Sequence, residues 1–144
     1  MRGEGFSSGL VFGNKFCCVL ILNMDIYNFE NLVAYQRAMD LVETIYGLLK
    51  KFPREEQFAL CDQLRRAVVS VPSNIAEGKS RMSHKEQQHF IEIAYGSLME
   101  TYCQLDIAKR LGYVSDEEFQ RVKGDIQDIA RPLSGLYKSL KGER

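Results

Sequence analysis

The sequence predicts an all-α fold, an up-down-up-down antiparallel four-helix bundle. From residue 32 onward, apolar residues recur at spacings of three and four in four successive segments, which is the pattern of amphipathic helices. The connections between these segments are short, and short connections make neighbouring helices run antiparallel. No segment alternates apolar and polar residues as a half-buried strand would.

The first predicted helix, residues 32–52, carries two adjacent rows of apolar residues. Together they form a face that is broader than a helix at the edge of a monomeric bundle usually needs. This breadth fits a thick core, and it fits equally well a core plus contact with another subunit. One row consists of Leu32, Tyr35, Met39, Val42, Tyr46 and Leu49, and the other of Ala38, Leu41, Ile45, Leu48 and Phe52.

Pro53 separates the first predicted helix from the second, because the residue before a proline avoids the helical region and a proline suits a first turn. Pro72 stands inside the second helix, where it removes a backbone hydrogen bond at a cost of roughly 3 kcal/mol. The apolar stripe continues on both sides of Pro72, which predicts one kinked helix; two helices meeting at Val71 are the alternative. Gly78 is predicted to end the helix in a left-handed conformation. The stripe consists of Phe58, Cys61, Leu64, Val68, Val71 and Ile75.

Two Ser-x-x-Glu sequences predict the starts of the third and fourth helices, at Ser83 and Ser115. The third helix runs to about Leu111 and is ended by Gly112. Its core seam consists of Ile91, Ala94, Leu98, Thr101, Leu105 and Ala108. The fourth has the most regular stripe, which continues past Pro132 and therefore predicts a second kink. This stripe consists of Phe119, Val122, Ile126, Ile129, Leu133, Leu136 and Leu140.

The composition is that of one soluble domain. The chain has 144 residues, of which 45% are hydrophobic and 26% charged, so a core can be buried without metals or disulfides. Basic and acidic residues are equal in number, 19 of each, and no overall charge points to nucleic acid or to a membrane surface. The four cysteines form no C-x-x-C sequence, which fits a reducing cytoplasm. We expect no cofactor and no membrane partner.

The N-terminal segment differs from the remainder of the chain. We expect residues 1–28 to be a poorly structured leader, residues 29–141 to form the bundle, and residues 142–144 to be a tail. The apolar run 16–22 is far shorter than the roughly 20 residues that span a bilayer. Met24 is the expected initiator, with the preceding residues read from upstream sequence.

Three sequence stretches carry a family resemblance: residues 63–78, 94–100 and 107–113. The first includes the motif Ser-Asn-Ile-Ala-Glu-Gly at residues 73–78. On these stretches the chain resembles, over about residues 29–141, the four-helix bundle proteins encoded in intervening sequences of bacterial 23S ribosomal RNA genes. The resemblance implies a homopentameric ring of bundles with no assigned enzymatic activity. The chain is also similar, more distantly, to the basic accessory protein of diversity-generating retroelements, from which its neutral charge departs.

The sequence offers little for catalysis or metal binding. Glu86 and His89 match the E-x-x-H spacing of di-metal bundles, but such a site needs two of these motifs and two further glutamates. No nucleophile motif or phosphate-binding glycine loop occurs. We therefore expect no enzyme, no catalytic residue and no metal ligand. A di-metal bundle enzyme is the alternative from another functional class.

Antiparallel packing brings basic residues from the connection of helices two and three to the C-terminal end of helix four. They would form a rim that contacts phosphate groups, or they would only complement the helix dipoles. The expected nucleic-acid contacts are Arg65, Arg66, Lys79, Arg81, Lys85, Lys138 and Lys141. For Arg65 and Arg66, in the middle of helix two, pairing with acids across a subunit boundary is a further alternative. The expected contacts between copies are Ala38, Leu41, Ile45, Tyr95, Met99 and Tyr102.

These features predict a non-enzymatic, self-associating bundle that acts as a scaffold or adaptor and engages RNA, or an RNA-bound protein, through its basic rims. A purely structural oligomer without a nucleic-acid role is a further alternative.

Overall fold

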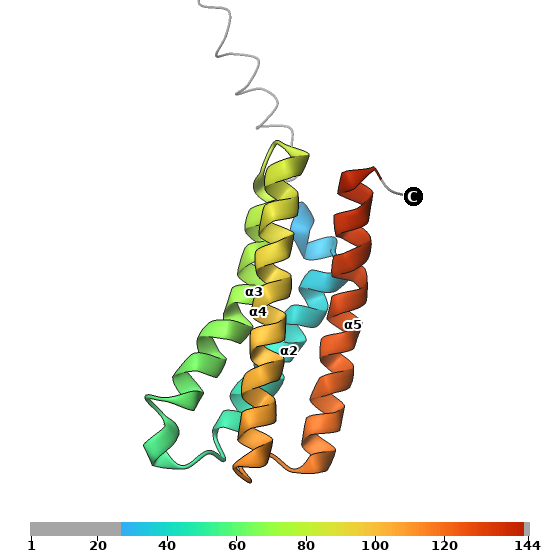
Figure 1. Cartoon of the computed structure of the whole chain (residues 1–144). Coiled ribbons are helices and arrows are strands. Elements are labelled where there is room, and N and C mark those ends of the chain that lie inside the picture. Colours follow the sequence, from blue (N-terminus) through green and yellow to red (C-terminus); the bar gives the residue numbers. More distant parts are fainter. Residues whose placement is uncertain (1–26, 143–144) are drawn as a thin grey trace, which may run out of the picture.

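The computed structural model describes residues 27–142, and over this range the chain is helical without strands. Four long helices form a bundle in which successive helices run antiparallel, as predicted (Figure 1). They are α2 (Val33–Leu49), α3 (Leu60–Ser80), α4 (His84–Arg110) and α5 (Asp116–Lys141), with short 3-10 turns η1 (Asn28–Asn31) and η2 (Arg54–Glu56). The predicted initiator Met24 and nearly all of the predicted leader lie outside the described residues.

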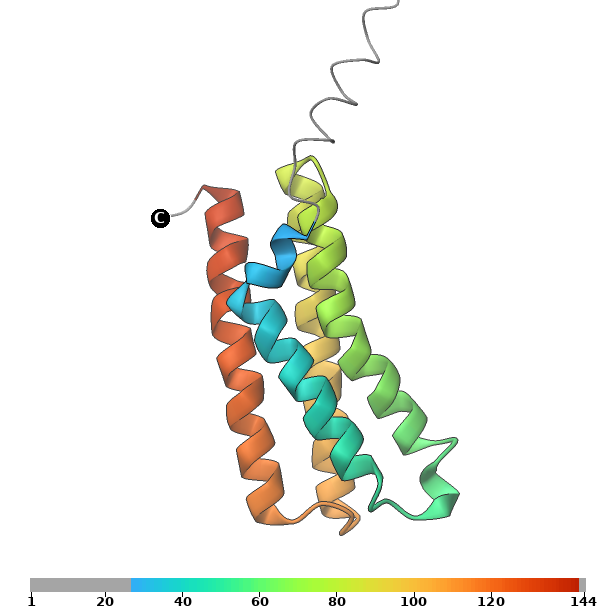
Figure 2. The same ribbon diagram turned by 180° about the vertical axis from the view of Figure 1, so that it is seen from behind.

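The helices occupy the corners of a square in chain order. α2 packs against α3 and α5, and α4 packs against the same two helices (Figures 1 and 2). The α3–α4 contact is the most extensive of these. Consequently α2 and α4 lie diagonally across the bundle, and their outer faces are on opposite sides of the molecule.

The two apolar rows of the first helix have different environments. Ala38, Leu41 and Ile45 are completely or almost completely buried in the core. In the other row, Met39 and Tyr46 each remain 42% exposed. The expectation that Ala38, Leu41 and Ile45 contact another copy conflicts with this burial, because their side chains have no surface left for a partner.

The helix α3 is continuous through Pro72, so the alternative of two helices meeting at Val71 is wrong. Pro72 leaves the carbonyl of Val68 without its helical donor. The next two carbonyls each accept an additional side-chain hydrogen bond. Ser73 Oγ donates to the Val69 carbonyl at 2.8 Å, and Asn74 Nδ2 donates to the Ser70 carbonyl at 2.7 Å. These polar side chains, together with burial of Pro72 itself, hold the helix across the proline.

Gly78 does not end α3, contrary to the prediction. The helix continues to Ser80, and the described glycines with positive φ are Gly112 and Gly142. A Cβ atom added to Gly78 would lie 2.9 Å from Phe90 Cβ and 3.3 Å from the Gln87 carbonyl oxygen. Gly78 therefore permits the close approach of α3 and α4.

The start of α3 also differs from the prediction. Phe58, assigned to the core stripe, precedes the helix and is 97% exposed. The chain after Pro53 forms η2 instead of the first turn of α3. Arg65 fixes this connection, because its guanidinium donates to the Gln57 carbonyl at 3.3 Å and to Gln57 Oε1 at 2.8 Å.

The remaining helix ends follow the sequence signals. Ser115 and Glu118 form a complete capping box at the start of α5. At the start of α4, Ser83 accepts a hydrogen bond from the Glu86 backbone, but the Glu86 carboxylate receives the Ser83 hydroxyl and not its backbone N–H. Gly112 adopts φ 81° after α4, as predicted.

Candidate functional site

Basic side chains gather at one end of the bundle. The turn between α3 and α4 lies at the same end as the C-terminus of α5 (Figures 1 and 2). This arrangement follows from the antiparallel order of the helices. It places five of the expected nucleic-acid contacts at this end, which we call the basic end: Lys79, Arg81, Lys85, Lys138 and Lys141.

The charges at the basic end are not equally available to a ligand. Arg81 forms an ion pair with Glu77 and lies over the Phe90 ring, 4.7 Å from its centroid. Lys85 and Lys138 are exposed, and neither forms an ion pair with any residue in the range 27–142. Lys85 and Lys138 are therefore the cations of the basic end that are most accessible to a phosphate group.

Arg65 and Arg66 lie apart from the basic end, in the first half of α3. Arg65 is half-buried and its donors are used by Gln57. Arg66 is exposed and pairs with Asp62 at 3.0 Å, one helical turn away. The structure thus gives Arg65 a structural contact that the sequence did not indicate.

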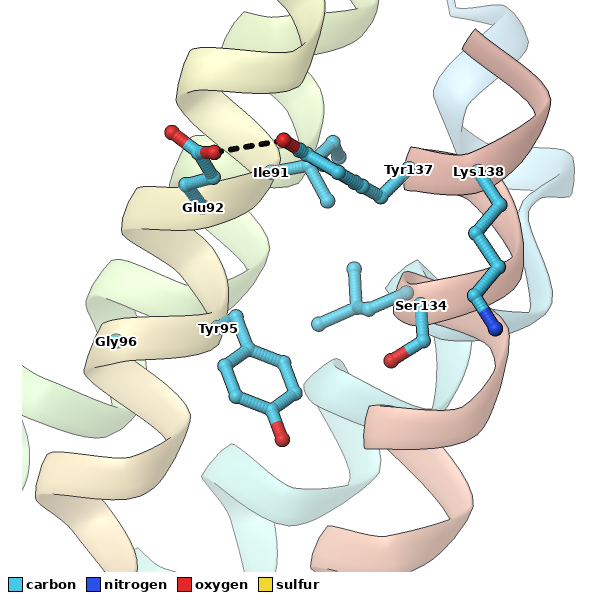
Figure 3. A pocket seen from close by; sticks show the side chains of 8 residues that line it. Ile91, Glu92, Tyr95, Gly96, Ser134, Tyr137 and Lys138 are labelled. Carbon is cyan, nitrogen blue, oxygen red and sulfur yellow. Dashed lines mark hydrogen bonds between the residues drawn. The ribbon is translucent and has the colours of Figure 1, made fainter. Parts of the chain in front are cut away.

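A groove of about 390 Å³ lies between α4 and α5, next to the basic end (Figure 3). Its base is apolar, since Ile91 and Leu133 are buried core residues that also line it. Tyr95 of α4 and Tyr137 of α5 present their rings to it. The Tyr137 side chain reaches from α5 toward α4, where its Oη donates to Glu92 Oε1 at 2.9 Å, so this bond joins the two helices at the edge of the groove. Ser134 and Lys138 complete the α5 wall.

Sequence reasoning did not identify Glu92, Ser134 or Tyr137. Tyr95, which was expected to contact another copy, lines this groove and is 41% exposed. The available signal was that Tyr95 and Tyr137 each flank the core stripe of helices predicted to be neighbours. That signal places two aromatic side chains on facing helices, but it does not show a groove between them.

The other expected contacts between copies are divided. Met99 lies on the surface of α4 and is 37% exposed. Tyr102 is half-buried, with its ring 5.7 Å from that of Phe119. Met99 is therefore available to a second copy, whereas Tyr102 mainly joins α4 to α5.

No group of three or more His, Cys, Asp or Glu side chains in the range 27–142 is arranged to hold a metal ion. Glu86 and His89, the E-x-x-H pair, are both exposed on α4. In the same part of the chain, no helix has the length and apolar character needed to cross a membrane.

Three described groups with clearly shifted pKa values lie away from the basic end. Burial raises the pKa of the Cys61 thiol. Burial, followed by the hydrogen bond to Glu56, raises the pKa of Tyr113. The Lys51 ammonium, which donates to Glu118 at 2.5 Å, is the largest cause that lowers the pKa of Glu118 to about 2. Tyr113 and Glu118 join connections at the opposite end of the bundle, through Glu56 and Lys51, and Cys61 is buried in the core.

Comparison with known proteins identifies the family. The model of the 23S rRNA-intervening sequence protein family matches residues 30–135. A solved structure from Bacteroides thetaiotaomicron, described as a protein with unknown function from the S23 ribosomal protein family, is similar in fold. The two chains share 23% sequence identity, and their superposition has a TM-score of 0.68. The match covers 74% of this chain and 96% of the Bacteroides chain. No curated protein matches the chain. Because the family match spans most of the sequence, the chain belongs to the 23S rRNA-intervening sequence protein family.

Proposed function

We propose that this protein is a non-enzymatic, self-associating helical bundle that acts as a scaffold or adaptor and engages RNA, or an RNA-bound protein, through its basic end. The observation that supports self-association most strongly is the position of its exposed apolar side chains. On the four long helices they concentrate on α2 and α4, whereas α3 exposes one large apolar side chain, Val69, and α5 exposes none. The exposed members are Val33, Met39 and Tyr46 on α2, and Ile93, Met99 and Ile107 on α4, where Tyr95 is also exposed but lines the groove toward α5.

The diagonal placement of these two faces favours a head-to-tail assembly. The α4 face of one copy would cover the α2 face of the next, because the two faces point to opposite sides of the bundle. Such a heterologous contact repeats around an axis and closes into a ring when the rotation between copies permits it. We propose a pentameric ring, the form that the family resemblance implies.

A ring would repeat the basic end once per copy. Each copy supplies only a few unpaired cations, so the affinity of one basic end for RNA is expected to be weak. Once one basic end of a rigid assembly is bound to a long RNA, the other basic ends are held near the same RNA at a high effective concentration. The overall affinity of the assembly for RNA therefore exceeds that of a single basic end. Multivalency therefore reconciles RNA binding with a chain of zero formal net charge.

The test is the salt dependence of binding to a fluorescently labelled fragment of 23S rRNA. We expect binding at about 50 mM salt that weakens steadily toward about 200 mM, as counterion release requires. The double variant Lys85→Gln, Lys138→Gln should weaken binding and reduce the salt slope. Lys50→Gln with Arg54→Gln is the matched control, since it removes two exposed cations from the opposite end of the bundle. Absence of binding at low salt would leave a purely structural oligomer, and equal losses in the two double variants would show that RNA is not bound through the basic end.

A further inference from the structure

The groove between α4 and α5 has the size and composition of a small-molecule site. Its volume of about 390 Å³ falls within the range of roughly 300–1,000 Å³ that is common for such sites. Ile91 and Leu133 give it an apolar base, and the rings of Tyr95 and Tyr137 border it from the two helices (Figure 3). A flat apolar ring is the kind of group that such walls accept, because aromatic side chains stack on planar π systems.

The groove also carries opposite charges on its two walls. Glu92 lies on α4 and Lys138 on α5. Glu92 is exposed, and the hydrogen bond from Tyr137 to Oε1 orients its carboxylate at the edge of the groove. Lys138 makes no ion pair among the described residues, so its ammonium group can accept an anion as partner. An occupant that matches both walls has N–H donors at one edge of a planar ring and a negative charge farther along.

A nucleotide combines these properties. Its base stacks on aromatic side chains, its Watson–Crick edge forms hydrogen bonds, and its phosphate pairs with a lysine. Guanine suits a carboxylate best among the four bases, because it presents two adjacent N–H donors. Ser134, which faces the groove, adds a hydroxyl near the phosphate side.

We propose that this groove binds a guanine nucleotide, with the base between Tyr95 and Tyr137, its donor edge at Glu92 and its phosphate at Lys138. The proposal rests on the RNA binding proposed above and specifies one contact of it. The same chemistry is offered by a free nucleotide and by an unpaired guanosine in an RNA strand, and the experiment separates these two sources.

The experiment uses the full chain and two kinds of probe. Isothermal titration with GMP and with AMP measures the free nucleotides, and we expect GMP to bind more tightly. Fluorescence anisotropy with a labelled oligouridine, with and without one central guanosine, measures the strand. Tighter binding of the guanosine-containing strand would assign the site to RNA, whereas GMP binding without this difference would assign it to free nucleotide.

Ser134→Met is the blocking variant, because it places a long side chain in the groove at an exposed helical position. It should weaken GMP binding roughly tenfold or more, as loss of base stacking does. Gln120→Met is the matched control on the same helix, away from the groove, and should leave binding unchanged. Glu92→Gln should remove the preference for GMP over AMP.

Two results would overturn the inference. If neither GMP nor the guanosine-containing strand binds while the 23S rRNA fragment still does, the groove is not a nucleotide site, although the proposed function stands. If Ser134→Met reduces the mass of the assembly and leaves GMP binding unchanged, the groove is a contact between copies. Failure of the rRNA fragment itself to bind would instead refute the proposed RNA-binding function.

Discussion

Replacement of Gly78 by alanine tests the close packing of α3 and α4. The added Cβ would lie 2.9 Å from Phe90 Cβ, whereas carbon atoms in good contact are about 3.5–4.0 Å apart. Neither Phe90 Cβ nor the Gln87 carbonyl oxygen, 3.3 Å away, can move without its backbone. The two helices must therefore separate by roughly 0.6–1 Å along their most extensive contact.

The expected cost follows from two opposing effects. Overpacking of a rigid interface costs typically 1–3 kcal/mol, and the fixed neighbours place this site toward the upper end. Alanine is favoured over glycine in a helix by about 1 kcal/mol, which offsets part of that cost. We expect Gly78→Ala to lower the free energy of unfolding by about 1–2 kcal/mol.

Gly47→Ala is the matched control. Gly47 lies within α2, and an added Cβ there would have no neighbour within 4 Å. This variant should raise the free energy of unfolding by about 0.5–1 kcal/mol. Urea unfolding followed by far-UV circular dichroism, at one fixed protein concentration, should show midpoints displaced in opposite directions. Stabilisation of both variants by similar amounts would refute the close-approach role of Gly78.

Three further predictions concern other contacts. Lys51 and Ser115 hold the pKa of Glu118 at about 2 against its ordinary 4.5, so the ionised carboxylate stabilises the fold above about pH 4.5. This contribution disappears as the pH falls toward 2, and Glu118→Gln should destabilise the protein at neutral pH but approach the wild type in acid unfolding curves. Phe58→Ser should change the free energy of unfolding by less than about 0.5 kcal/mol in guanidinium titrations, and a loss above about 2 kcal/mol would return Phe58 to the core. Asn74→Ala removes the donor to the Ser70 carbonyl and should cost about 1 kcal/mol in thermal unfolding; an unchanged midpoint would show that Pro72 needs no such support.

The fold follows from the sequence because the apolar spacing is strong and the connections are short. The stripe of the fourth helix is the clearest case: Phe119, Val122, Ile126, Ile129 and Leu133 are all buried. The order of the helices then places the α3–α4 turn beside the end of α5, which is why the basic end was predictable.

Features that depend on distances between helices were not predictable. The spacing of Phe58 fits the α3 stripe, but the helix begins only at Leu60, after η2. Gly78 matches a helix stop in sequence, and its packing role emerges only from the position of Phe90. The groove between α4 and α5 is likewise defined by side chains of two helices, so neither helix alone indicates it.

The mass of the full chain in solution, measured by light scattering without RNA, tests the central claim of self-association most directly. We predict one discrete species whose mass is five times that of a single chain. Met39→Glu or Met99→Glu should dissociate it, because each puts a charge on one of the two exposed apolar faces, whereas Gln120→Glu on α5 should not. A stable monomer across the accessible range of protein concentration would contradict the claim.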